Sequence, residues 1–233
     1  MISTSSAQTR PDNPYYARKN TFGLFGAFSD DSSHILLGSA DNRKLLDIGV
    51  SYSRRLMLGH IVNWQYTAEL LPVALESDPV VHTVYKQILP TPMVYTQTFR
   101  QVSPCAAASG SYDDKFPGIT FSGTYATTCA RTWAIGEAFS PAGMQWNFLP
   151  RRKIQPIVIG HGGYMYSTQT IPIDYAGSFN FTFDLGVGVE VFRNQTRSIR
   201  AEYRYHHISN DDTGEFNPGI DNGLLQVTYC FGR

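Results

Sequence analysis

The segment from Phe179 to Val191 constrains the fold of this chain more than any other part of the sequence. Its apolar residues alternate without a break with residues that are polar or glycine; the apolar set is Phe179, Phe181, Phe183, Leu185, Val187, Val189 and Val191. A helix cannot produce this pattern, because helix faces repeat every 3.6 residues whereas strand faces repeat every two. We therefore predict a β-strand here, long enough to cross a bilayer at a tilt.

Weaker alternation of the same kind occurs along the rest of the chain. Seven further strands are predicted, at about 21–29, 44–54, 59–70, within 131–148, and at 154–167, 199–209 and 221–231. The turns after the second, fourth and sixth strands are short and basic, whereas the other connections are longer. Such alternation is typical of outer-membrane barrels, with tight periplasmic turns and long outer loops. We predict an all-β fold, an eight-stranded antiparallel transmembrane β-barrel over 21–233, with a long extracellular loop at about 71–130.

The main alternative is a soluble, lipocalin-like barrel with its apolar residues facing inward. Strand parity does not separate the two folds, but a soluble barrel has no reason to segregate short and long loops, and it packs its aromatics around a ligand. The opposite, presumed inward parity carries Asp47, Glu69, Asp184, Glu190, Arg200, Glu202 and Arg204. Eight strands leave room for side chains only, so these charges are expected to form a paired network and not to line a pore.

Charge and hydropathy exclude other classes. Lys plus Arg and Asp plus Glu number 19 each, so no basic field exists to attract nucleic acid. No run of about 20 apolar residues is present, which excludes a transmembrane helix. Residues 1–20 form an N-terminal segment without the apolar stretch of a signal peptide. Because a barrel of this kind needs export, we expect the signal upstream of Met1, and Ser5-Ser6-Ala7 resembles a cleavage site that leaves Gln8 as the mature end.

Cys105 and Cys129 flank a stretch rich in Gly, Ser and Asp within the long loop. In an exported protein a disulfide between them is plausible, and the alternative is two unpaired thiols. The spacing of the cysteines and histidines does not indicate a zinc site.

Polar residues interrupt the apolar parity near the end of the chain. His207 and Ser209 lie two apart on one face of their strand, and Asp221 returns on the same face of the next strand after a loop. A serine hydroxyl becomes nucleophilic when a base takes its proton and a carboxylate orients that base. These three side chains are thus expected at one rim of the wall that faces lipid, where an acyl ester is within reach.

Two sequence motifs resemble the PagL-type lipid A 3-O-deacylases, which are eight-stranded outer-membrane barrels. The specific match is His207-x-Ser209-Asn210 followed by Asn217-Pro218-Gly219-Ile220-Asp221, and strand 179–192 and the segment 140–148 match more loosely. The resemblance implies that Ser209 is the nucleophile, His207 the general base and Asp221 the orienting carboxylate. Asn210 and Asn217 become candidates for stabilising the oxyanion. It further implies an esterase without a cofactor or metal, which acts on lipid A of lipopolysaccharide in the bacterial outer membrane.

The chain departs from the family pattern at two points. Asp221 replaces the usual glutamate and is one methylene shorter, so its contact with His207 is expected to need a backbone shift or a water. Asp211 and Asp212 stand where small residues are common, and they place negative charge near the developing oxyanion.

Several other interpretations of these residues are open at this point. His207 could extend toward lipid headgroups as an interfacial residue. His206 points inward by parity and is expected to belong to the internal network. Carboxylates at 211, 212, 215 and 221 could bind Ca²⁺. As a whole, the protein could be a non-catalytic barrel that serves adhesion, interaction or membrane integrity through its long loop.

Overall fold

The computed structural model describes residues 15–233, and the expected cleavage site at Ser5-Ser6-Ala7 lies outside them. Ten antiparallel strands make up the described part: β1 (Asn20–Ser29), β2 (Lys44–Leu58), β3 (Val62–Leu89), β4 (Met93–Arg100), β5 (Ala108–Phe116), β6 (Ile119–Phe148), β7 (Ile154–Ile171), β8 (Gly177–Phe192), β9 (Arg197–Ser209) and β10 (Ile220–Gly232). Residues 15–233 contain no helix with the length and hydropathy of a membrane span.

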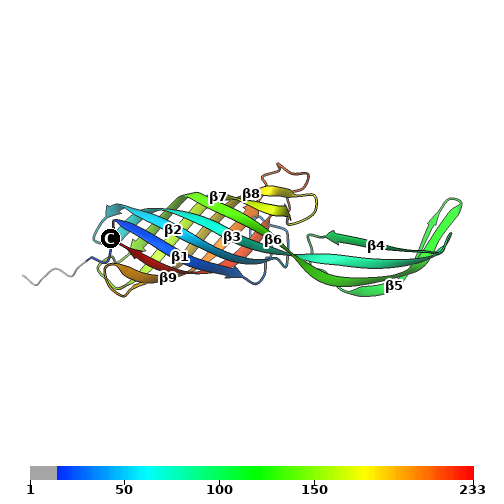
Figure 1. Ribbon diagram of the computed structural model, residues 1–233, viewed down its shortest axis with the longest axis horizontal. Coiled ribbons are helices and arrows are strands. Elements are labelled where there is room, and N and C mark those ends of the chain that lie inside the picture. The colour runs from blue at the N-terminus through cyan, green and yellow to red at the C-terminus, as the bar shows by residue number, and fades with distance from the viewer. Residues whose placement is uncertain (1–14) are drawn as a thin grey trace, which may run out of the picture.

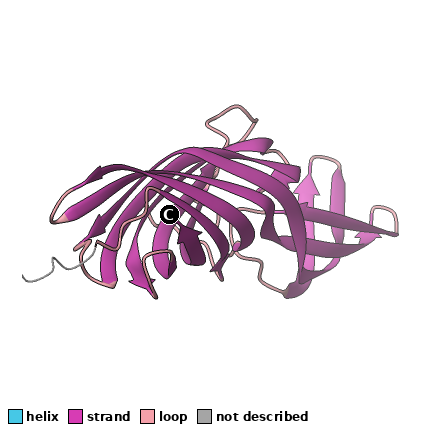
Figure 2. Ribbon diagram, turned by 60° about the vertical axis from the view of Figure 1, so that its left-hand side comes forward, coloured by secondary structure: helices cyan, strands magenta, loops and turns pink. Residues whose placement is uncertain are grey.

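Eight of these strands close into a barrel, as predicted (Figures 1 and 2). The hydrogen-bonded order runs β3-β2-β1-β10-β9-β8-β7-β6, and β6 pairs back with β3. The first and last strands meet where β1 pairs with β10, and the amide of Asn20 donates to the carbonyl of Arg233 at 2.9 Å. Closure leaves none of the eight barrel strands with a free edge, which a bilayer requires.

The apolar faces of the strands point outward, and this excludes the lipocalin-like alternative. Along β8 the seven apolar residues from Phe179 to Val191 are 41–60% exposed. Their polar neighbours Asn180, Asp184 and Glu190 are buried inside the barrel. A soluble protein would have the reverse arrangement, so the outer wall is built to contact hydrocarbon.

The interior charges form the paired network that the sequence predicts, except that Asp47 is buried without an ion pair in the described residues. Arg204 donates to both oxygens of Glu69 at 2.8 Å and pairs with Glu202 at 2.6 Å. Arg200 also pairs with Glu202, and Arg18 with Glu190. Such pairing with additional hydrogen bonds is the condition under which buried charges are tolerated.

A cluster of small and aliphatic side chains fills the interior above this network. Its members are Ala27, Ala40, Leu45, Ala74, Ala134, Ala138, Met165, Ile171, Ile208, Ile220 and Leu224. A cavity of about 30 Å³ lies between the cluster and the charges, which is space for about two water molecules. The lumen is therefore packed.

Connection lengths follow the prediction except at one place. The turns 59–61, 149–153 and 193–196 are short, whereas 30–43 and 210–219 are long and lie at the other end of the barrel. The connection from β7 to β8 covers only 172–176, because both strands continue past the rim as a hairpin (Figure 1).

The expectation of a loop over 71–130 is wrong for most of that segment. β3 continues to Leu89 and β6 begins at Ile119, and β4 and β5 pair with their outer parts. We call this four-stranded sheet, residues 79–131, the extension; it projects from the barrel (Figure 1). Its outermost strands are exposed on both faces, so they have no apolar face to produce an alternating sequence.

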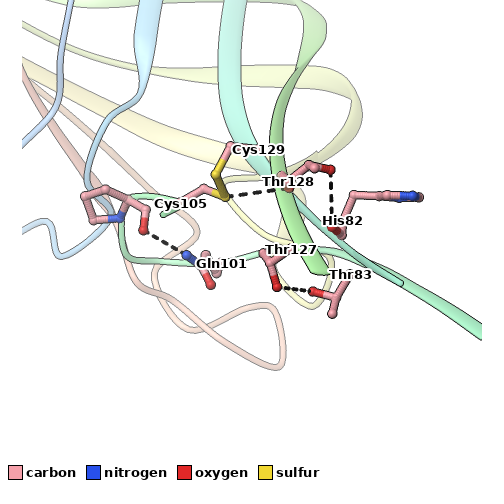
Figure 3. Close-up of a disulfide and its surroundings, with 8 residues drawn as sticks. His82, Thr83, Gln101, Cys105, Thr127, Thr128 and Cys129 are labelled. Carbon is pink, nitrogen blue, oxygen red and sulfur yellow. Dashed lines mark hydrogen bonds between the residues drawn. A yellow bond between two sulfur atoms is a disulfide. The ribbon is translucent and has the colours of Figure 1, made fainter. Parts of the chain in front are cut away.

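A disulfide between Cys105 and Cys129 ties the segment that joins β4 to β5 onto β6 (Figure 3). Cys129 lies opposite Val81 of β3, near the base of the extension. The bridge thus closes a covalent loop that contains β5 and the outer part of β6.

Candidate active site

The β9–β10 hairpin brings His207 and Asp221 together at the rim of the barrel. The two residues are direct partners in the antiparallel register. On the other side of β9, His207 is opposite Phe183 and Ser209 is opposite Phe181 of β8. All of these side chains have the outward parity, so the polar groups lie among lipid-facing aromatics.

Asp221 is completely buried although its side chain leaves the outer face of the wall. Oδ1 accepts hydrogen bonds from Nδ1 of His207 at 2.6 Å and from the hydroxyl of Tyr205 at 2.8 Å. Oδ2 accepts the backbone N–H groups of Leu36 and Leu37 at 2.7 and 2.8 Å. The shorter aspartate therefore reaches His207 directly, and the backbone shift or bridging water expected from the sequence is not needed.

The His207 ring is held in one orientation. It stacks on Tyr205, with ring centroids 6.5 Å apart and an angle of 12° between the planes, and its side chain is 12% exposed. Because Nδ1 is directed at the carboxylate, Nε2 is the nitrogen left to accept a proton. A carboxylate in this position fixes the tautomer and stabilises the imidazolium that forms.

Ser209 is next to His207 on this face but hydrogen-bonds elsewhere. Its hydroxyl donates to Oδ1 of Asn217 at 2.9 Å, and the backbone N–H of Asp211 donates to Oγ at 3.2 Å. Within residues 15–233 no hydrogen bond joins Ser209 to His207. Oγ is therefore directed at Asn217 and not at the imidazole ring.

The two asparagines occupy different environments. Nδ2 of Asn210 donates to the carbonyl of Phe216 at 2.7 Å, and its side chain is buried inside the rim. Asn217 lies on the same side as Ser209 and accepts hydrogen bonds through Oδ1 from Ser209 and from the backbone of Asn210. In the described part of the chain, Nδ2 of Asn217 donates to no protein group.

Sequence reasoning missed the residues that hold the carboxylate from above. A segment of the β1–β2 connection crosses the start of β10, and at Gly38 it passes so close that a Cβ would lie 2.6 Å from the Asp221 nitrogen. Gly219, with a φ of +60°, faces Gly38 across this contact. Gly219 belongs to the recognised motif, but nothing in the sequence of residues 32–40 indicates contact with residues some 180 positions away.

His206, on the opposite face, lies inside the barrel as parity predicts. It pairs in register with Asp184 and lines the small cavity beside Arg204. It faces the lumen and has no access to an external ester, and its Nδ1 has no hydrogen-bond partner within residues 15–233.

Two acidic groups can be compared as possible metal sites. Ligand atoms of Glu69, His161 and Asp184 lie within 4.8 Å of one another, but Arg204 already supplies the positive charge there through two hydrogen bonds to Glu69. The carboxylates at 211, 212, 215 and 221 do not converge on a common point within the described residues. Both carboxylate oxygens of Asp221 already accept hydrogen bonds from protein groups. Asp221 is therefore not free to bind Ca²⁺.

Comparison with models of known protein families identifies the family of this chain. The family model described as "Lipid A 3-O-deacylase (PagL)" matches residues 109–229, more than half of the 233 residues. The chain belongs to the PagL family. The protein is therefore a bacterial outer-membrane barrel, and its family activity is hydrolysis of acyl esters of lipid A.

Solved structures add little beyond this assignment. An outer membrane channel from Pseudomonas putida F1 aligns at 7% identity over 99% of both chains with a TM-score of 0.31. LpxR from Salmonella typhimurium aligns at 6% identity over 91% of this PagL-family chain and 100% of its own, with a TM-score of 0.27. Scores this low carry no weight, and the barrel assignment depends on the strand pairing described above. A comparison with curated proteins gives no match.

Proposed function

We propose that this protein removes the 3-O-linked acyl chain of lipid A through an acyl-serine intermediate on Ser209. The observation that carries the proposal is the hydrogen bond of 2.6 Å between His207 and a buried, fully hydrogen-bonded Asp221, on the lipid-facing wall two residues from a serine. An ester in the outer leaflet can reach this rim without leaving hydrocarbon.

In the first step the Ser209 hydroxyl turns toward Nε2 of His207, which takes its proton as Oγ attacks the ester carbonyl carbon. Asp221 stabilises the imidazolium through Nδ1. The negative charge passes to the former carbonyl oxygen, and Nδ2 of Asn217 stabilises this oxyanion by donating a hydrogen bond to it. In this proposal Asn210 has a different role, because its own amide group holds Phe216 and thereby the loop that carries Asn217.

The tetrahedral adduct collapses to the acyl-serine when the carbon–oxygen bond to the sugar breaks. His207 gives its proton to the leaving sugar oxygen, which departs as a hydroxyl. Water then attacks the acyl-serine with the same base, releasing a fatty acid and regenerating Ser209. The reaction consumes only water.

The decisive experiment compares lipid A from cells that express wild type, Ser209→Ala or His207→Asn. Wild type should release one acyl group, detected by mass spectrometry, and loss of Ser209 or His207 should reduce turnover on the order of 10⁶-fold. Asn217→Ala should cost about 10²- to 10³-fold, mainly in kcat.

His206→Asn is the matched control, because it changes a neighbouring histidine on the inner face. It should retain deacylation. Identical lipid A from wild type and Ser209→Ala cells would contradict the proposal and favour a non-catalytic barrel.

A further inference from the structure

The segment that holds Asp221 presents an apolar tip to the outside. We call residues 32–40 the strap and Ile35, Leu36 and Leu37 its tip. Leu36 is 74% and Leu37 69% exposed, and no large hydrophobic side chain in residues 15–233 is more exposed than Leu36. Three consecutive exposed aliphatic residues beside a reactive site need a physical reason.

The position of the strap follows from the direction of the Asp221 side chain. Asp221 has the same parity as Leu225, which is 54% exposed on the outer wall, so its carboxylate leaves the wall outward. The N–H groups of Leu36 and Leu37 donate to that carboxylate. The strap therefore runs along the edge of β10 and covers the outward-facing carboxylate of Asp221, so that its tip lies on the outer side of the barrel wall.

The strap is firmly attached, so the exposure of its tip does not result from a loose loop. Backbone hydrogen bonds join Ser33 to Asp221 at 3.1 Å, Ser39 to Pro218 at 2.7 Å and Ala40 to Gly219 at 3.0 Å. The Ser32 hydroxyl closes the base of the strap by donating to the carbonyl of Ala40 at 2.6 Å. With both ends fixed, the leucine side chains cannot turn inward without breaking these contacts.

We propose that the tip inserts among the acyl chains of the outer leaflet and that this insertion positions the catalytic carboxylate at the lipid surface. In this arrangement, Leu36 and Leu37 contact hydrocarbon with their side chains and hydrogen-bond Asp221 with their backbone N–H groups. Leu36 and Leu37 are thus positioning residues whose anchoring holds His207 and Ser209 at the depth of the ester. The catalytic part of this inference rests on the proposed function, whereas the insertion itself does not.

Insertion is tested with a nitroxide label at Leu36→Cys in protein reconstituted into phospholipid vesicles. Labelling is selective, because Cys105 and Cys129 form a disulfide and Cys230 is buried. Leu225→Cys on the outer wall and Val94→Cys on the extension, 54% and 68% exposed, serve as lipid and water references. The label at Leu36 should collide with oxygen as Leu225 does; collision with a water-soluble nickel complex at the level of Val94 would overturn the proposal.

Coupling to catalysis is tested by replacing both leucines with serine, which leaves the backbone donors in place. Turnover of lipid A in vesicles should fall about tenfold through KM, and hydrolysis of a short, water-soluble p-nitrophenyl ester in detergent should fall severalfold less, because the backbone donors to Asp221 remain. Equal loss on both substrates would mean that the strap only supports the structure of the site. Unchanged turnover on both would mean that the tip does not contribute to catalysis. Either result would contradict the proposed coupling.

Ser209→Ala, measured in the same two assays, separates this inference from the proposed function. If it leaves hydrolysis intact, the serine mechanism fails, while the nitroxide result still decides whether the tip is inserted.

Discussion

The barrel and the extension share two strands, β3 and β6, which continue from lipid-facing into water-exposed surroundings. Within the barrel, β3 buries Asn63, Gln65, Thr67 and Glu69 and turns apolar residues outward; beyond the rim, β4 beside it is exposed on both faces. In the barrel, buried ion pairs, closure and lipid contact fix the structure. In the extension, ion pairs of Arg100 with Asp78 and Asp174 hold the base of β4, and a disulfide and a cluster of tyrosines hold the rest: Tyr85 stacks on Tyr95 at 4.8 Å and meets Tyr112 edge-on at 6.0 Å between ring centroids. The contrast shows that solvent, and not strand formation, decides which interactions a sheet needs.

The largest effect is expected from Arg204→Ala inside the barrel. It leaves the Glu69 and Glu202 carboxylates without their shared partner in a packed interior, and breaking a buried pair in this way costs about 3–5 kcal/mol. Unfolding by urea in vesicles should show the lower midpoint. Adding Glu69→Gln should recover part of the loss, and a double variant as unstable as the single one would show that this pair is not the source of the cost.

Replacing Cys105 and Cys129 together by serine should destabilise only the extension. The covalent loop spans 24 positions, and in the chain-entropy model such a loop contributes about 3.5 kcal/mol. Limited proteolysis should cut the extension sooner and leave a barrel core with wild-type resistance. An equal loss of resistance in the barrel would mean that the two regions unfold as one unit.

An arginine added to the protein surface should distinguish strands that face lipid from strands that face water. Leu185→Arg, near the middle of β8, is expected to cost about 2–4 kcal/mol because arginine would enter hydrocarbon. Val94→Arg on β4, at a side chain 68% exposed, should leave stability unchanged. Folding yields into vesicles measure both, and equal yields would contradict the membrane placement of β8.

The smallest effect is expected at the surface of the extension. Lys115 lies 3.5 Å from Asp113, and both side chains are mostly exposed. Solvent-exposed pairs contribute little, so Lys115→Ala should not change the proteolysis pattern. A visible change would show that charge pairing stabilises the extension as it does the barrel.

The expected site residues were accessible to sequence reasoning for one reason. His207, Ser209 and Asp221 lie on two consecutive strands, where parity and antiparallel pairing determine which side chains share a face. Tyr205 is on that same face and could have been added. Leu36, Leu37 and Gly38 could not, because their contact with Asp221 joins segments 184 or 185 positions apart, through backbone groups that carry no sequence signal.

The barrel strands and the alternation of their apolar and polar faces follow from the amino-acid order alone, because a period of two is a local property of the chain. The outward direction of the apolar faces, the sheet over 79–131 and the strap that covers Asp221 became known only from the folded arrangement. These features depend on which strands pair at a distance and on which side of the closed sheet a connection passes, and local alternation is the same for either outcome.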